Sequence, residues 1–167
     1  MFSISTCESE GSVKHMPMRL GTPMPSLEGV TEWWNSDGEP KLDPNKVTLI
    51  HFWAVSCHIC HETMNDVIAI KDKYAKDGLQ VVALHMPRME EDTNIERVKH
   101  DVEEYNIRQP LGLDHQHTVA NRFENEYVPA FFIFGKDGTL KFRAAGDKGF
   151  QKVEPKIREA LGLPPEE

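Results

Sequence analysis

The feature that most constrains this chain is an apolar stretch that leads into a close pair of cysteines. The stretch Val47–Ala54 is apolar, β-branched or aromatic apart from one histidine, which is typical of a central parallel strand covered on both faces. After Cys57 the apolar residues recur at helical spacing as far as Tyr74. Cys57 and Cys60 therefore lie at a predicted junction between a strand and a helix.

This junction is a favourable place for a reactive thiol. Unpaired backbone N–H groups and the helix dipole stabilise a thiolate at a helix N-terminus, which lowers the pKa of a cysteine from its usual value of about 8.5. Cys60 lies one helical turn further on, close enough to resolve a mixed disulfide. We predict that Cys57 is the nucleophile and Cys60 the resolving thiol. His58 is a candidate for redox tuning, because a positive charge beside the Cys57 thiolate would favour the reduced pair.

Three other interpretations of the pair were weighed. Cys57-His-Ile-Cys60-His61 fits the pattern for haem attachment, but that attachment needs export, and no export signal is visible. The same Cys/His cluster could bind zinc or copper, although no second cluster follows at the spacing of a structural zinc site. An inert pair would not be expected at a strand-to-helix junction. We expect no cofactor and no metal, and we keep a redox-gated metal-binding or interaction module as the alternative function.

The remainder of the sequence predicts one α/β domain. Further strands are expected at 79–86 and 110–114, and further helices at 94–105, 118–124 and 151–161. A hairpin is expected from 130–134 and 139–145, and another around 36–38 within a Pro- and Gly-rich stretch. This order predicts a mixed central sheet flanked by helices.

Composition excludes some partners. The formal net charge of −8 argues against nucleic acid and anionic membranes as partners. No stretch has the roughly 20 consecutive apolar residues of a membrane helix, and the N-terminus lacks an apolar signal-peptide core. We therefore expect a cytoplasmic monomer. Residues 1–17, including Cys7, are expected to be disordered or cloning-derived, residues 18–163 a single domain, and residues 164–167 a frayed tail.

Two motifs together resemble a known family. The stretch Phe52-Trp-Ala-Val-Ser-Cys57-His-Ile-Cys60, with Tyr127-Val-Pro129-Ala-Phe-Phe much later, resembles the thioredoxin superfamily. More narrowly, it is similar to bacterial thioredoxin-like thiol-disulfide oxidoreductases of the TlpA/ResA type. The resemblance implies a thioredoxin fold with an N-terminal β extension and an inserted strand and helix between about Leu79 and Asp114. It also implies disulfide-containing protein substrates and a dithiol protein as electron donor or acceptor.

The resemblance also assigns roles to individual residues. It implies that Pro129 follows a cis peptide bond and faces the disulfide, so that the Val128 backbone lies beside Cys57. An extended substrate could pair with that backbone by strand addition. Trp53, four residues before the pair, is a further candidate for redox tuning.

The sequence departs from the family pattern around the cysteines. His51 stands where thioredoxins have a buried acid that manages the proton of the second cysteine, although a lone histidine in a strand is more often a core residue. Related proteins often have a glutamate three residues after the second cysteine, where this chain has Thr63 preceded by Glu62. His51 and Glu62 are thus the candidates for proton transfer. Asn65 replaces the usual helix-kinking proline, so we expect a straighter helix.

Overall fold

A computed structural model describes residues 17–166 of the protein, and within that range the strands form one six-stranded sheet. The strands are β1 (Glu32–Trp34), β2 (Val47–Trp53), β3 (Leu79–His85), β4 (Leu111–Leu113), β5 (Ala130–Phe134) and β6 (Leu140–Ala145). The helices are α2 (His58–Tyr74), α3 (Ile95–Glu104), α4 (Thr118–Arg122), α5 (Gly146–Phe150) and α6 (Val153–Leu161), with short 3-10 helices η1 (Ala75–Asp77) and η2 (Glu90–Thr93).

The sheet is mixed, as the sequence predicts. Its strand order is β1-β4-β3-β2-β5-β6. The strands β2, β3 and β4 are parallel neighbours, whereas β5 pairs antiparallel with both β2 and β6. Every residue of β2 is buried, which explains why its sequence is continuously apolar rather than alternating.

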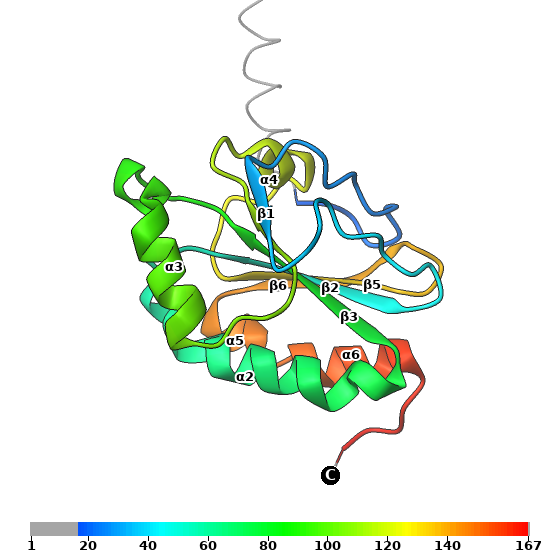
Figure 1. Ribbon diagram of the computed structural model, residues 1–167. Helices are drawn as coiled ribbons and strands as arrows, with labels where there is room; N and C mark the ends of the chain where they lie inside the picture. The colour runs from blue at the N-terminus through cyan, green and yellow to red at the C-terminus, as the bar shows by residue number, and fades with distance from the viewer. Residues whose placement is uncertain (1–16, 167) are drawn as a thin grey trace, which may run out of the picture.

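Helices cover both faces of the sheet (Figure 1). The helices α2 and α6 lie along one face, and α4 lies on the other. The side chains of β2 alternate between these layers: Leu49 packs in a cluster with residues of α2 and α6, whereas Ile50 packs with residues of α4. A third buried cluster contains both active-site cysteines, Trp53 and residues of α3. This third cluster places the cysteine pair directly on the core.

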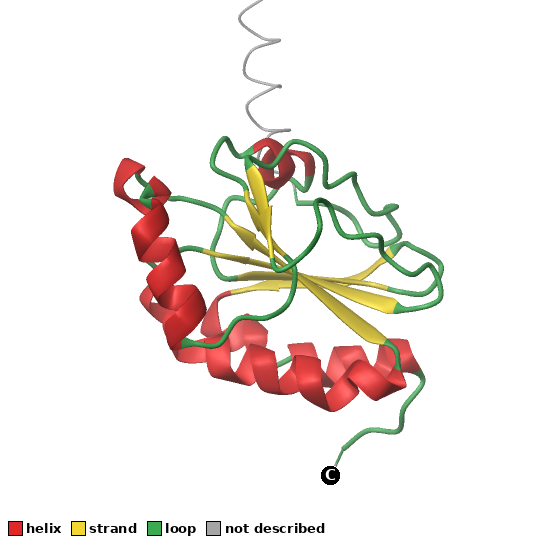
Figure 2. Cartoon of the chain, in the orientation of Figure 1, coloured by secondary structure: helices red, strands yellow, loops and turns green. Residues whose placement is uncertain are grey.

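The elements between β3 and α4 form the predicted insertion. It consists of η2, α3 and β4, and the picture coloured by secondary structure shows α3 as a separate helix at the side of the sheet (Figure 2). Asn94 caps α3 by accepting the Glu96 N–H at 2.9 Å. We name residues 87–105, the part of this insertion that precedes β4, the inserted segment, because it contacts the residues on both sides of the cysteine motif.

The predicted hairpin around residues 36–38 is wrong. The strand β1 pairs antiparallel with β4, with Trp33 opposite Gly112, instead of with a neighbouring strand in the chain. A Cβ atom at Gly112 would lie 3.0 Å from the Trp33 ring, so the absent side chain makes room for that indole. β1 is the N-terminal β extension that the resemblance implies.

The C-terminal region has two helices where the sequence predicts one at 151–161. α5 follows β6 directly and is separated from α6 by a short turn. Beyond α6, Pro164 accepts a hydrogen bond from Arg158, and Glu166 pairs with Lys73 at 2.6 Å.

The domain boundaries and the frayed tail stay predictions, and most of residues 1–17, with Cys7, lies outside the described residues. In the described part of the chain, no helix combines the length and apolar character needed to cross a membrane.

Candidate active site

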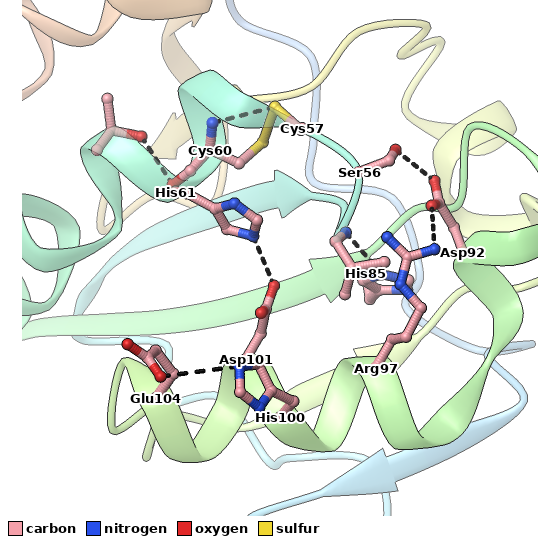
Figure 3. Close-up of polar contacts among 12 residues, drawn as sticks. Ser56, Cys57, Cys60, His61, His85, Asp92, Arg97, His100, Asp101 and Glu104 are labelled. Atoms are coloured by element: carbon pink, nitrogen blue, oxygen red, sulfur yellow. Dashed lines mark hydrogen bonds and ion pairs between the residues drawn. A yellow bond between two sulfur atoms is a disulfide. The ribbon is translucent and has the colours of Figure 1, made fainter.

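The two cysteines lie at the start of α2, beyond the carboxyl end of β2, and form a disulfide (Figure 3). Cys57 is the N-cap residue of α2, with extended backbone angles, and its Sγ accepts the Cys60 N–H at 3.0 Å. Cys57 is 3% exposed and Cys60 is fully buried. The helix therefore begins where the sequence predicts, with Cys57 at the positive end of its dipole.

The active-site helix is long and unbroken. α2 runs for 17 residues from His58 to Tyr74, across the position of Asn65. Its buried side includes Met64 and Val67, which anchor the helix to the core beneath the cysteines. The straighter helix expected from the missing proline stays a prediction.

Trp53 and His85 pack beneath the loop that leads to Cys57. Both side chains are fully buried, and their rings meet edge to face with centroids 4.9 Å apart. The Val55 N–H donates to His85 Nε2 at 3.2 Å, so the imidazole acts as an acceptor. Burial lowers the pKa of His85 to about 3, which keeps the ring neutral at physiological pH. His85 therefore supports the loop through a neutral hydrogen bond, a role that its sequence position did not suggest.

Ser56, the residue before Cys57, is held by the inserted segment. Its hydroxyl donates to Asp92 Oδ2 at 2.7 Å, and the Arg88 N–H donates to the same oxygen at 2.8 Å. The Arg88 guanidinium donates to Ser56 twice, from Nη2 to the carbonyl oxygen at 2.7 Å and from Nε to the hydroxyl at 3.2 Å. This network could not be predicted from the sequence, because Ser56 and its partners are more than thirty residues apart.

The inserted segment also contacts the residue after Cys60. His61 Nε2 lies 2.7 Å from Asp101 Oδ2, and the imidazole stacks on Tyr105 with ring centroids 5.5 Å apart. Asp101 is largely buried, whereas His61 is partly exposed. These contacts tie the first turn of α2 to α3, as Figure 3 shows.

The predicted tuning residue His58 and the proton-transfer candidate Glu62 lie together at the surface. Their side chains are 84% and 58% exposed, and His58 Nε2 lies 3.1 Å from Glu62 Oε2. Solvent screens charges at such positions, which weakens any effect on the cysteines. Neighbouring Thr63 is buried, and its hydroxyl donates to the Ile59 carbonyl oxygen at 3.0 Å. The roles of His58 and Glu62 stay predictions.

The other proton-transfer candidate, His51, is a buried core residue. Its ring stacks on Phe131 at a centroid distance of 5.0 Å and is fully buried. Neither ring nitrogen has a hydrogen-bond partner in the described part of the chain. Burial lowers the pKa of His51 to about 3, so the neutral ring carries no second proton to donate near neutral pH. Its role in proton transfer stays a prediction.

The loop before β5 lies against the buried cluster that contains the cysteines. The Val128–Pro129 peptide bond is cis, as the resemblance implies, and Val128 packs against the cluster that contains both cysteines. The Pro129 carbonyl oxygen accepts the Gly146 N–H at 3.0 Å. Buried Asn125 donates to the Tyr127 carbonyl oxygen at 2.9 Å and thereby holds the start of this loop. The fold thus brings the two distant sequence motifs together.

Comparison with known proteins agrees with this geometry. The chain is 43% identical to the thiol-disulfide oxidoreductase YkuV of Bacillus subtilis over 86% of this chain and 97% of that protein. It is 28% identical to protein DipZ of Mycobacterium tuberculosis over 82% of this chain but only 20% of DipZ. A solved structure, titled as the solution structure of a thioredoxin-like protein in the oxidized form, matches with a TM-score of 0.77 and 41% identity, over 87% of this chain and 98% of that one.

A family model described as thioredoxin-like matches residues 45–140, which include both cysteines and the Val128–Pro129 loop. The match spans more than half of the chain, and the similarity to YkuV over 86% of this chain supports it independently. The thioredoxin fold and the family resemblance inferred from the sequence are therefore confirmed. This chain belongs to the thioredoxin-like family.

Proposed function

We propose that this protein is a thiol-disulfide oxidoreductase that reduces or exchanges disulfides in protein substrates. The observation that carries the proposal is the Cys57–Cys60 disulfide at the N-terminus of α2, within a buried cluster against which Val128 also packs. The similarity to YkuV, which is itself named a thiol-disulfide oxidoreductase, supports the same reaction.

The reduced protein performs the exchange in two displacement steps. The Cys57 thiolate attacks one sulfur of a substrate disulfide, which forms a mixed disulfide and releases the other substrate sulfur as a thiolate that takes up a proton. The Cys60 thiolate then attacks the Cys57 sulfur and releases the second substrate thiol. Two electrons pass to the substrate, and the protein is left with the Cys57–Cys60 disulfide. A second dithiol protein restores the reduced pair by the reverse exchange.

The order of attack follows from the burial of the two cysteine residues. Cys57 retains a small exposed area and receives a helix N–H at its sulfur, whereas Cys60 has none of its surface exposed. A substrate sulfur can therefore reach Cys57 first, and Cys60 is screened from external disulfides until the mixed disulfide has formed.

Substrate positioning is assigned to the loop of Val128 and Pro129. The backbone of Val128 lies at the end of β5 nearest to the cysteines, where an extended peptide can pair with it. The adjacent Tyr127 is 65% exposed and offers an apolar ring beside that path.

The compartment and assembly state are also proposals. Three cysteines in 167 residues do not describe a disulfide-stabilised secreted domain, which supports a reducing, cytoplasmic setting. Within residues 17–166, the exposed large hydrophobic side chains are Leu20, Met89 and Tyr127, which are dispersed along the chain and support a monomer.

Two substitutions test the proposed reaction. Cys60→Ser should accumulate mixed disulfides with substrate proteins, because the resolving thiol is missing, and Cys57→Ser should abolish disulfide reduction. Cys7→Ser, which leaves the pair intact, is the matched control and should retain activity. Full activity of Cys57→Ser would refute the proposal. A stoichiometric metal retained by a protein without exchange activity would instead favour the binding-module alternative.

A further inference from the structure

We propose that Arg88 and Asp92 are positioning residues that hold the segment before Cys57 and set the reactivity of its sulfur. The inference rests on the proposed exchange reaction, and it concerns residues that lie outside the cysteine motif and the Val128–Pro129 loop. It begins with the hydrogen bonds that these two residues make with Ser56.

The network fixes Ser56 on both its backbone and its side chain. Arg88 binds the Ser56 carbonyl oxygen and hydroxyl with two guanidinium nitrogens, and Asp92 accepts the hydroxyl proton. Asp92 is fully buried, so its bonds to the Ser56 hydroxyl and the Arg88 N–H are shielded from water. Ser56 therefore has little freedom to rotate, and Cys57, as the next residue and the cap of α2, inherits this fixed orientation.

The network also brings the Arg88 cation to the residue next to Cys57. Arg88 carries one positive charge and Asp92 one negative charge, and Arg97 lies 3.9 Å from the second oxygen of Asp92. Buried His85 is neutral and adds no charge. On the other side of Cys57, the titratable side chains in the first turn of α2 are His58 and His61, which face Glu62 and Asp101.

A cation at this position stabilises the Cys57 thiolate. Because thiolate stabilisation favours the reduced pair, loss of the Arg88 charge should raise the pKa of Cys57 and shift the equilibrium toward the disulfide. The Arg88 side chain is exposed, so solvent screening limits the size of both effects. We expect a change of about threefold to tenfold in the acid dissociation constant of Cys57 and in the dithiol–disulfide equilibrium constant. Loss of the Asp92 charge should instead lower the pKa of Cys57 and shift the equilibrium toward the reduced pair.

The test compares charge-changing variants by two measurements. The pKa of Cys57 is followed by thiolate absorbance in a Cys60→Ser background, and the dithiol–disulfide equilibrium with glutathione is measured in proteins that retain both cysteines. Arg88→Met should raise the pKa and favour the disulfide, whereas Arg88→Lys should recover part of the effect by restoring the charge without the forked hydrogen bonds. Arg108→Met is the matched control, because Arg108 is exposed and precedes the amino end of β4, away from the cysteines.

The sign of the shifts separates positioning from a general structural role. Asp92→Asn keeps the shape of the side chain but removes its charge, and it should lower the pKa of Cys57 while Arg88→Met raises it. If Arg88→Met and Arg108→Met gave the same pKa of Cys57 and the same equilibrium with glutathione, while the protein still exchanged disulfides, the inference would be overturned. The proposed function would then still stand. Absence of exchange in the unsubstituted protein would instead overturn the proposed function.

Discussion

The buried histidines make the stability of this protein sensitive to mild acid, and His51 provides the clearest test. His51 and His85 are both neutral in the folded state because burial lowers the pKa of each from 6.5 to about 3. In the unfolded chain each ring regains its ordinary pKa and binds a proton below about pH 6.5. Acid therefore favours the unfolded state. The contribution of each neutral ring to stability is present above the unfolded pKa and is lost as the pH falls through the window down to about 3.

The size of this effect follows from the two pKa values. A displacement of one pKa unit corresponds to about 1.4 kcal/mol, so from about pH 7 to about pH 5 each histidine should lower the free energy of unfolding by about 2 kcal/mol. The two histidines together should lower it by about 4 kcal/mol. His51→Phe removes one of them and should leave a loss of about 2 kcal/mol over the same range. The substitution should also stabilise the protein at neutral pH, since both nitrogens of His51 lack a hydrogen-bond partner in the described chain.

Urea unfolding of the oxidised protein at the two pH values measures these differences directly. His100→Gln is the matched control, because it also removes a histidine but at a position where the side chain is 73% exposed. If His51→Phe lost as much stability between the two pH values as the unsubstituted protein, His51 could not be the buried neutral group inferred from its surroundings.

Three further substitutions test contacts that support the site. Asp114→Asn should destabilise the protein by about 1.5–3 kcal/mol in urea unfolding, because the buried carboxylate accepts two backbone N–H groups of α4, and unchanged stability would contradict this capping role. Gly112→Ala should cost about 1 kcal/mol in thermal unfolding, because the new methyl group would press on Trp33, and a stabilised variant would argue against this close packing. A double-mutant cycle of His61→Ala and Asp101→Ala should give a coupling of about 1 kcal/mol, and strictly additive effects would show that the contact contributes nothing.

The central part of the fold could be predicted because its signals are local. The apolar stretch of β2, the helical spacing after Cys57 and the cap position of that cysteine all depend on residues close in sequence. The same locality explains the two errors in the fold. β1 pairs with β4, about eighty residues away, whereas the turn-rich sequence around it predicts a local hairpin. α5 has two glycines among five residues, and its propensity gives no helix signal.

The supporting residues of the site could not be predicted for the same reason. In the sequence, His85 is one residue of a predicted strand, and Asp92 is one acid in an acidic run. Only the fold shows that they bind Val55 and Ser56. A buried carboxylate and a neutral histidine become recognisable only through their partners. The cysteines, in contrast, can be recognised in the sequence by their spacing alone.

The contacts of the inserted segment with Ser56 and His61, on either side of the cysteine motif, have a consequence for protein engineering. Ser56 depends on a carboxylate 36 positions further along the chain, and His61 on another 40 positions away. A Cys-x-x-Cys tetrapeptide transplanted from a relative would be flanked by contacts that suit the original motif. It would therefore not keep the reactivity that it has in the relative. The smallest unit that can be exchanged between relatives as a functional cassette is therefore discontinuous: the motif with its two neighbours, together with residues 88, 92 and 101.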